Sequence, residues 1–346
     1  MRKEKALRSV MAMLLALCLC LAALAGCEQK GRDAQDASDK KTEEKADSNE
    51  EYVLVSVQTT MPLFMDHEYK AFEAWGKARG VKTSIVGPTE WDVAEQVTSL
   101  EQVIASKPAG ILCNGSDPQI AVAVNSAVKA GIPIITFDGE VPGAEPLGHI
   151  GSDWYEVGVA QARSMAELIG EKGEVAMIGV VGLQNQSQGF QGFTDTMEKE
   201  YPDIKIVGTF TDNATVEGAA EATNNIMSAY PDIAGIAGFA SVSGPGIGQA
   251  VKEADKVGKI KITCVDGQPE HLDLVKSDVI SKLIVQKREL FGWLGGQYLY
   301  DYVHNNIPLT KDDKQAGVTC IPRNTNTGYI EVTKDNVDLF IENYAK

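Results

Sequence analysis

The chain has 346 residues, of which 44% are apolar and 23% charged, and its formal net charge is −16. This length exceeds what one hydrophobic core usually covers, so we expect two lobes of ordinary size. An acidic chain without a basic stripe repels phosphate backbones and anionic membranes, which argues against nucleic acid as a partner.

The first 26 residues have the three-part layout of a secretory signal: a basic head, an apolar run over 10–24, and small residues before Cys27. The apolar run is shorter than the roughly 20 residues that a spanning helix needs. Leu24-Ala25-Gly26-Cys27 resembles the lipobox of bacterial lipoproteins, which implies cleavage before Cys27 and lipidation of its thiol. Lipid chains on Cys27 would anchor the protein to the cell membrane on its extracytoplasmic face. The alternative is an ordinary signal peptide followed by a chance cysteine.

Residues 27–50 are rich in Asp, Glu, Lys, Ser and Ala, and after Cys27 they include no aromatic or branched apolar side chain. Such a segment cannot bury enough surface to fold, so we expect a flexible tether.

From Tyr52 onward, short β-branched runs alternate with amphipathic stretches at a step of roughly 25–30 residues, which is typical of βα units around a parallel sheet. Several runs are apolar without alternation, as expected where helices cover both faces of a sheet. We expect strands at 53–57, 81–86, 110–113, 133–137, 175–180, 204–210, 235–239, 260–265 and 280–285.

Helix-start signals separate these runs. Pro62 suits a first helical turn. Asp92 and Glu95 form a capping-box pattern that opens a helix running to Ser106. Asp117 precedes a proline as an N-cap. Five βα units reach to about residue 151 and a similar set follows to about 286, which predicts two doubly wound α/β lobes. Ligands in such sheets lie beyond the carboxyl ends of the strands.

Two of the expected strands end in an aspartate followed by glycine, at Asp138 and Asp266. A carboxylate there can accept hydrogen bonds from two neighbouring hydroxyl groups, and charge-assisted bonds are roughly twice as strong as neutral ones. Each Asp-Gly pair could instead only form a turn or a helix cap. The matching positions in the two halves favour the ligand-binding interpretation.

Other residues near strand ends are further candidates for ligand contacts. Phe64 could lay its ring on the apolar face of a sugar, or simply pack in the core. Gln286 could bond a hydroxyl group, or lie at the surface. The weaker candidates are Asn213, Ser243, Trp91 and Trp154; the two tryptophans could line a cleft, although a packing role is favoured for both.

The sequence predicts neither an enzyme nor a metal or cofactor site. The four histidines lie far apart without ligand spacing, and no GxSxG elbow occurs. The segment 243–248 is glycine-rich but lacks the lysine of a phosphate-binding loop, so we expect a turn into a helix. Cys113 and Cys264 lie in apolar runs and are expected to be buried free thiols.

The chain after Tyr52 resembles the ribose-binding type of periplasmic sugar-binding proteins. The resemblance rests on the order and spacing of comparable segments, namely Pro62-x-Phe64, 131–138, His149-Ile-Gly-Ser-Asp153, Val265-Asp266-Gly267 and Gln286. Val86-Gly-Pro-Thr89 with Gln96 is also similar to members that bind rhamnose or autoinducer-2.

The resemblance implies a ligand held between two lobes joined by three hinge crossings, near Asp153, Gln286 and Cys320. The lobes would comprise 51–153 with 287–319, and 154–286 with 320–346. It implies Phe64 as a stacking ring, and Asp138, Asp266 and Gln286 as hydrogen-bonding groups.

Two arginines of the ribose binders fall on glycines in this chain, at Gly139 and at Gly189, where Gln188 is the nearby polar side chain. Near Asn213 the ribose binders have an aromatic residue, and near Ser243 they have an asparagine that is Val242 here. These departures disfavour ribose and leave other sugars or polyols.

The resemblance therefore implies a monomeric receptor that captures a sugar or polyol for the permease of an ABC importer. The alternative is that the same protein presents its ligand, such as autoinducer-2 or a rhamnose-like sugar, to a chemotaxis receptor or a sensor kinase. An anchored enzyme on the same fold is a third possibility, and it would require turnover of the bound compound.

Overall fold

A computed structural model describes residues 49–115 and 117–344, which belong to one compact unit, Asp47–Lys346. The expected signal segment, Cys27 and nearly all of the tether lie outside the described residues. Within the described part, no helix is both long and apolar enough to cross a membrane.

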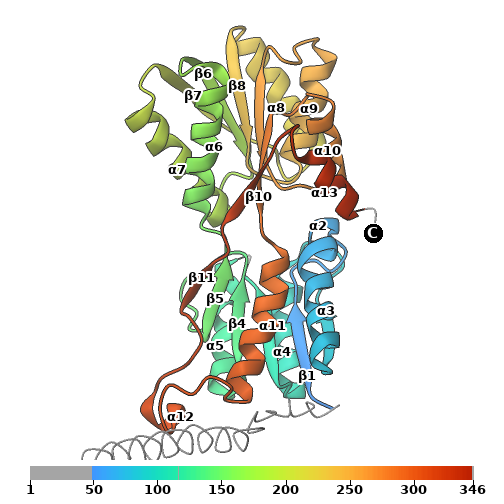
Figure 1. Ribbon diagram of the computed structural model, residues 1–346, viewed down its shortest axis with the longest axis vertical. Helices are drawn as coiled ribbons and strands as arrows, with labels where there is room; N and C mark the ends of the chain where they lie inside the picture. Colours follow the sequence, from blue (N-terminus) through green and yellow to red (C-terminus); the bar gives the residue numbers. More distant parts are fainter. Residues whose placement is uncertain (1–48, 116, 345–346) are drawn as a thin grey trace, which may run out of the picture. The chain divides into compact units, whose positions relative to one another are not determined.

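Two six-stranded sheets form the framework of this unit (Figure 1). The strand order in the first sheet is β11-β5-β4-β3-β1-β2, and all neighbouring strands are parallel. Its strands are β1 (Glu51–Val55), β2 (Lys82–Val86), β3 (Gly110–Asn114), β4 (Ile134–Phe137), β5 (Gly148–Gly151) and β11 (Asn324–Asn326).

The second sheet has the order β12-β10-β9-β8-β6-β7 and is parallel except for the antiparallel pair of β10 and β12. Its strands are β6 (Gly173–Gly179), β7 (Ile204–Thr211), β8 (Ile233–Gly238), β9 (Lys261–Val265), β10 (Lys282–Gln286) and β12 (Tyr329–Val332). Two sheets of this kind confirm the predicted α/β class.

Helices follow the strands in both halves. The helices of the first half are α2 (Pro62–Phe64), the π-helix η1 (Met65–Tyr69), α3 (Lys70–Arg79), α4 (Val93–Ser106), the 3-10 helix η2 (Pro118–Ile120), α5 (Ala121–Lys129), α11 (Glu289–Val303) and α12 (Asp313–Ala316). The helices of the second half are α6 (Trp154–Ile169), α7 (Gln184–Glu200), α8 (Val216–Ala229), α9 (Ser243–Glu253), α10 (Pro269–Lys276) and α13 (Val337–Tyr344).

The apolar runs form strands because both faces of each sheet are covered. Along β6, Val175 and Met177 pack in one buried cluster with residues of α6 and α7, whereas Ala176 and Ile178 pack in another with residues of α8 and α9. Since successive side chains of a strand point to opposite faces, a strand buried on both faces must be apolar throughout.

The starts of the helices follow the capping signals in the sequence. The side chain of Asp92 accepts a hydrogen bond from the backbone of Glu95 at the start of α4, and that of Asp117 accepts one from Gln119 at the start of η2. Both bonds satisfy backbone donors that a helix start leaves without partners.

Three chain crossings join the two sheets: β5 to α6, β10 to α11, and β11 to β12 (Figure 1). The first two lie at the expected positions near Asp153 and Gln286. The third was expected near Cys320, but β11 still belongs to the first sheet, so the crossing occurs at Thr327 and Gly328. The hydroxyl of Ser152 donates a hydrogen bond to the carbonyl of Gly328 at 3.1 Å, which ties the first crossing to the third.

Each of the nine predicted strands is present, with ends that differ by up to two residues, whereas β5, β11 and β12 were not predicted. These three are short, and β5 and β11 consist largely of glycine and polar residues. The glycine-rich segment at 243–248 forms the first turns of α9 and is not a turn before a helix. Cys113 and Cys264 are buried free thiols, as predicted.

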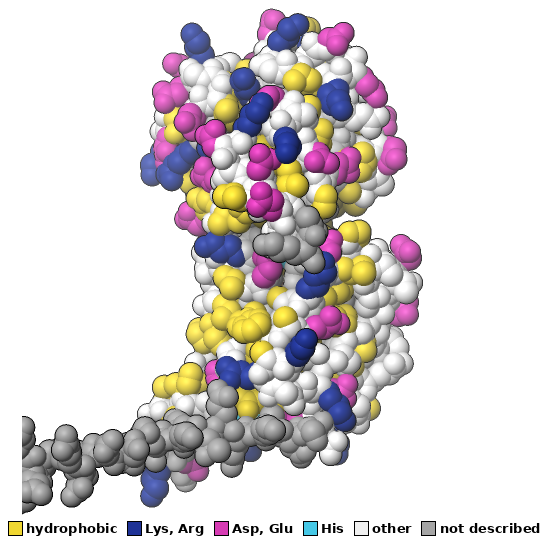
Figure 2. Space-filling view, turned by 45° about the vertical axis from the view of Figure 1, so that its right-hand side comes forward, with side chains coloured by type: hydrophobic (Ala, Val, Ile, Leu, Met, Phe, Trp, Pro, Cys, Tyr) yellow, Lys and Arg dark blue, Asp and Glu magenta, His cyan; other side chains and the backbone are white. Residues whose placement is uncertain are grey.

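Charged side chains of both signs are interspersed over the face drawn in Figure 2, and no basic stripe stands out there.

Candidate functional site

The aspartates that end β4 and β9 adopt an unusual backbone conformation. Asp138 has a φ of 72° and Asp266 a φ of 67°. Residues other than glycine rarely adopt this left-handed backbone conformation, although aspartate tolerates it better than most. Such strain is often found at binding sites, because the rest of the fold can hold a side chain in one required direction.

Asp138 is paired with a buried arginine, Arg288, which follows β10 at the second crossing. Its Nη1 and Nη2 donate to the two carboxylate oxygens of Asp138 at 3.3 and 3.0 Å. On its other side, Nε and Nη2 donate to the carboxylate of Glu68 at 3.0 and 2.6 Å. Arg288 is 3% exposed and Glu68 is fully buried. The guanidinium therefore joins a carboxylate of η1 to the carboxylate that ends β4.

Two phenylalanine rings pack against the same guanidinium. Its Cζ atom lies 5.2 Å from the ring centroid of Phe64 and 5.2 Å from that of Phe291. A desolvated cation over an aromatic face is attracted to the ring quadrupole. Phe64, predicted to stack on a ligand, packs on Arg288 in this structure and is 4% exposed.

The protonation of this cluster follows from burial and from the charges within it. Burial raises the pKa of Glu68 to about 7, although Arg288 opposes the rise. Burial alone would lower the pKa of Arg288. The attraction of the guanidinium to Asp138 and Glu68 prevails and holds that pKa well above the usual value. Arg288 therefore stays charged, with two carboxyl groups against its single positive charge.

Asp266 lies close enough to this cluster for its charge to interact with Arg288 and Asp138. Burial raises the pKa of its carboxyl group, Arg288 opposes that rise, and Asp138 adds to it. Its Oδ1 atom is buried and has no hydrogen-bond partner among the described residues, and the same is true of Oε1 of Gln286. Unpaired buried acceptors are costly, so these two oxygens are candidates for bonds to a ligand.

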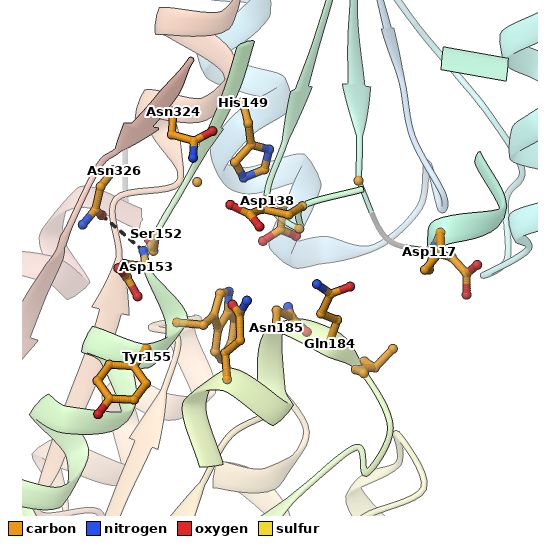
Figure 3. A pocket seen from close by; sticks show the side chains of 18 of the residues that line it. Asp117, Asp138, His149, Ser152, Asp153, Tyr155, Gln184, Asn185, Asn324 and Asn326 are labelled. Atoms are coloured by element: carbon orange, nitrogen blue, oxygen red, sulfur yellow. Dashed lines mark hydrogen bonds between the residues drawn. The ribbon is translucent and has the colours of Figure 1, made fainter. Parts of the chain in front are cut away.

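A cavity of about 560 Å³ opens beside Asp138, within the size range of small-molecule sites. Figure 3 shows Asp138 and His149 on one side of it and Gln184 and Asn185, from the start of α7, on the other. The lining residues include Trp91, Gly115, Asp117, Asp138, Gly139, Glu140, His149, Asp153, Trp154, Gln184, Asn185, Gln188, Asn324 and Asn326.

The charged side chains that line this cavity are acidic, and none is a lysine or an arginine. Burial lowers the pKa of His149, the one histidine in the lining, which favours its neutral form. Trp154 is 5% exposed, and its Nε1 is a buried donor without a partner in the described part of the chain. Amides, carboxylates and an indole donor suit a neutral, hydroxyl-rich ligand better than an anion.

Four of the nine predicted ligand-binding residues line the cavity: Asp138, Trp91, Trp154 and Gln188. Three more do not line it but belong to the cluster beside it: Phe64 packs on Arg288, Asp266 interacts with the charge of Arg288, and Gln286 interacts with Asp266. Direct binding by any of them stays a prediction.

Asn213 and Ser243 are not among the lining residues. Asn213 is exposed, and its backbone N–H donates a hydrogen bond to the hydroxyl of Thr211, two residues earlier. The hydroxyl of Ser243 is buried and donates to Asp212 at 2.6 Å, which fixes the start of α9. Ligand contact by these two residues also stays a prediction.

Three important side chains were missed in the sequence: Arg288, Glu68 and Asn114. Asn114 ends β3, is 1% exposed and has an unpaired Oδ1, so the rule that found Asp138 could have found it. Glu68 lies inside a helix and Arg288 two residues beyond a strand, where a charged residue normally faces water. Their pairing could not be read from local sequence.

Gly139 cannot carry the arginine that the resemblance places there. A Cβ atom on Gly139 would lie 2.0 Å from the carbonyl oxygen of Gly115, and one on Gly115 would lie 1.9 Å from that of Gly139. The two backbones touch at the ends of β3 and β4, so the cation of this site comes from elsewhere in the chain.

Residues 49–115 and 117–344 contain no group of three or more His, Cys, Asp or Glu side chains arranged to hold a metal ion.

A model of the periplasmic binding protein domain matches residues 52–306. The xylitol-binding protein of Mycolicibacterium smegmatis is 26% identical over 82% of this chain and 77% of its own. A sugar-binding protein of a sugar ABC transporter from Bacillus halodurans superimposes with a TM-score of 0.79 at 32% identity, over 84% of this chain and all of that one. An arabinose-binding protein from Geobacillus stearothermophilus gives 0.76 at 33% identity, over 84% of this chain and 99% of that one.

Proposed function

Because the chain belongs to the periplasmic binding protein domain family, we propose that it is the extracytoplasmic receptor of an ABC importer for a neutral monosaccharide or polyol. Binding rather than catalysis is common to its relatives, which are named for the sugars or polyols that they bind. The prediction that the chain is not an enzyme is confirmed by these comparisons.

The observation that carries the proposal is the convergence of strand ends from both sheets on one cluster. Asp138 comes from the first sheet and Asp266 from the second, and both interact with Arg288. Unpaired oxygens on Asp266 and Gln286, and the unpaired indole donor of Trp154, supply acceptors and a donor for hydroxyl groups. Burying a hydroxyl group is favourable only where such partners exist.

Binding would favour the arrangement of the two sheets in which both sets of contacts are made. A ligand shifts a conformational equilibrium only by its difference in affinity for the two states. A sugar that bonds Asp138 on one side and Asp266 on the other binds the closed state more tightly, and that state would be the one the permease recognises. Cys27 would hold the receptor at the membrane through its lipid.

The test is a thermal-shift screen of the full chain, purified in mild detergent, against pentoses, hexoses, deoxyhexoses, polyols and nucleosides. A ligand present at a hundred times its Kd stabilises the folded state by about 2.7 kcal/mol. We expect at least one neutral sugar or polyol to raise the Tm by several degrees and to be recovered unchanged. If no compound of these classes raises the Tm, the proposal fails.

The transport role is tested by deleting the gene and measuring uptake of the labelled ligand. We expect uptake to be lost, and to return with the wild-type chain but not with Asp266→Ala. Normal uptake together with a lost chemotactic or transcriptional response would favour the signalling alternative instead.

A further inference from the structure

The cation that pairs with Asp138 comes from a part of the chain that the resemblance did not indicate. In the ribose binders the arginines near this site fall on positions that are Gly139 and Gly189 here. A Cβ atom at Gly139 would collide with backbone, and one at Gly189 would lie 3.0 Å from the ring of Phe239. Arg288, 150 residues after Asp138, bonds both oxygens of its carboxylate instead.

We propose that Arg288 is a positioning residue that orients the Asp138 carboxylate toward the ligand. Glu68 would anchor Arg288 and restrict the site to neutral solutes. This inference rests on the proposed function, since it assumes that Asp138 bonds a sugar or polyol.

The geometry leaves the guanidinium little freedom. Four of its five N–H donors are engaged by the two carboxylates, and two phenylalanine rings lie against it. A bidentate arginine fixes the plane of a carboxylate as well as its position. Asp138 lines the cavity, whereas Arg288 does not, so Arg288 would act on the ligand through Asp138.

The charge balance of the cluster argues for a neutral ligand. Glu68 and Asp138 place two carboxyl groups against one guanidinium, and Asp266 adds a third nearby. The cavity adds further acidic side chains, Asp117, Glu140 and Asp153, without a lysine or an arginine in its lining. A carboxylate on the solute would meet unfavourable charge here, although Arg288 is close by.

Double variants test whether Arg288 acts through Asp138. With the sugar or polyol that binds the wild type most tightly, we expect Arg288→Lys to lower affinity about tenfold or more, because an ammonium group lacks the planar pair of donors that fixes the plane of the carboxylate. In an Asp138→Asn background the same change should lower affinity no further. Ligand-detected NMR extends the measurement to weak binding.

Arg79→Lys is the matched control for this series. Arg79 also bonds a side chain, that of Gln297, and lies over an aromatic ring. We expect Arg79→Lys to leave the affinity unchanged in both backgrounds.

Glu68→Gln tests the charge argument with a readout that a purely structural role would not move. At pH 8, above the pKa of about 7 that burial gives Glu68, this change removes one buried negative charge. It should then favour a uronic acid over the pentose with the same hydroxyl pattern, shifting their affinity ratio about tenfold. Glu200→Gln, whose partner Arg163 is half-exposed on the second half of the molecule, is the control and should leave the ratio unchanged.

Two outcomes would overturn the inference. One is that the losses from Arg288→Lys and Asp138→Asn multiply as independent effects. The other is that Glu68→Gln weakens pentose and uronic acid in parallel. Should Arg288→Lys fail to fold, as judged by circular dichroism, the Glu68→Gln ratio decides alone. If the wild type binds no sugar or polyol, the proposed function itself has failed, which is a different result.

Discussion

Lowering the pH from 7 to 5 is expected to destabilise the second half of the molecule through His271. This side chain at α10 is 1% exposed, and its ring nitrogens have no hydrogen-bond partner of good geometry in the described part of the chain. Burial lowers the pKa of His271 from 6.5 to about 4, which outweighs the opposing effect of the backbone at Ser241. The folded state therefore holds a neutral ring where the unfolded chain holds a charged one.

The sign and size of the change in unfolding free energy follow from the linkage between protonation and folding. Because the folded pKa is the lower one, stability is fully present above pH 6.5 and falls as the pH drops toward 4. The full drop of the pKa from 6.5 to about 4 corresponds to about 3 kcal/mol. Between pH 7 and pH 5 the expected loss is about 2 kcal/mol.

The assay is denaturant unfolding of the wild type and of His271→Gln at both pH values, followed by tryptophan fluorescence and circular dichroism. Glu68, whose raised pKa has the opposite effect on stability over this range, is present in both proteins and cancels from the comparison. We expect the wild type to lose about 2 kcal/mol more than the variant on acidification. Equal losses in the two proteins would refute the argument.

Three further predictions concern the site and the core. Asp266→Ala should weaken ligand binding by about 1.5–3 kcal/mol, the range for a hydrogen bond to a charged group, and unchanged calorimetric affinity would remove Asp266 from the site. Gly139→Ala should lower the Tm, because its Cβ would lie 2.0 Å from the carbonyl oxygen of Gly115; an unaltered Tm would mean that the backbones separate easily. Trp75→Ala should cost about 3–5 kcal/mol of unfolding free energy, because the indole is fully buried and meets the ring of Tyr52 edge-on at 5.2 Å; a loss below about 1 kcal/mol would contradict the packing argument.

Local patterns were enough to find most of the framework. The strand at 175–180 could be predicted because both of its faces are buried, so its residues are apolar without interruption. β11 escaped prediction because Asn324-Thr-Asn326 is polar, and it is a strand only through its pairing with β5. The third crossing was misplaced near Cys320 for the same reason.

The candidate site, too, was predictable only in part. By itself the sequence determined that Asp138 and Asp266 end strands, because hydrophobic runs and the Asp-Gly pairs that stop them are short-range signals. Only the tertiary structure decided that Arg288 meets Glu68, 220 residues away, and takes the place of a cation that the contact of Gly115 with Gly139 excludes. Ion pairs of this kind depend on which strand ends meet in space, and that depends on how the whole chain packs.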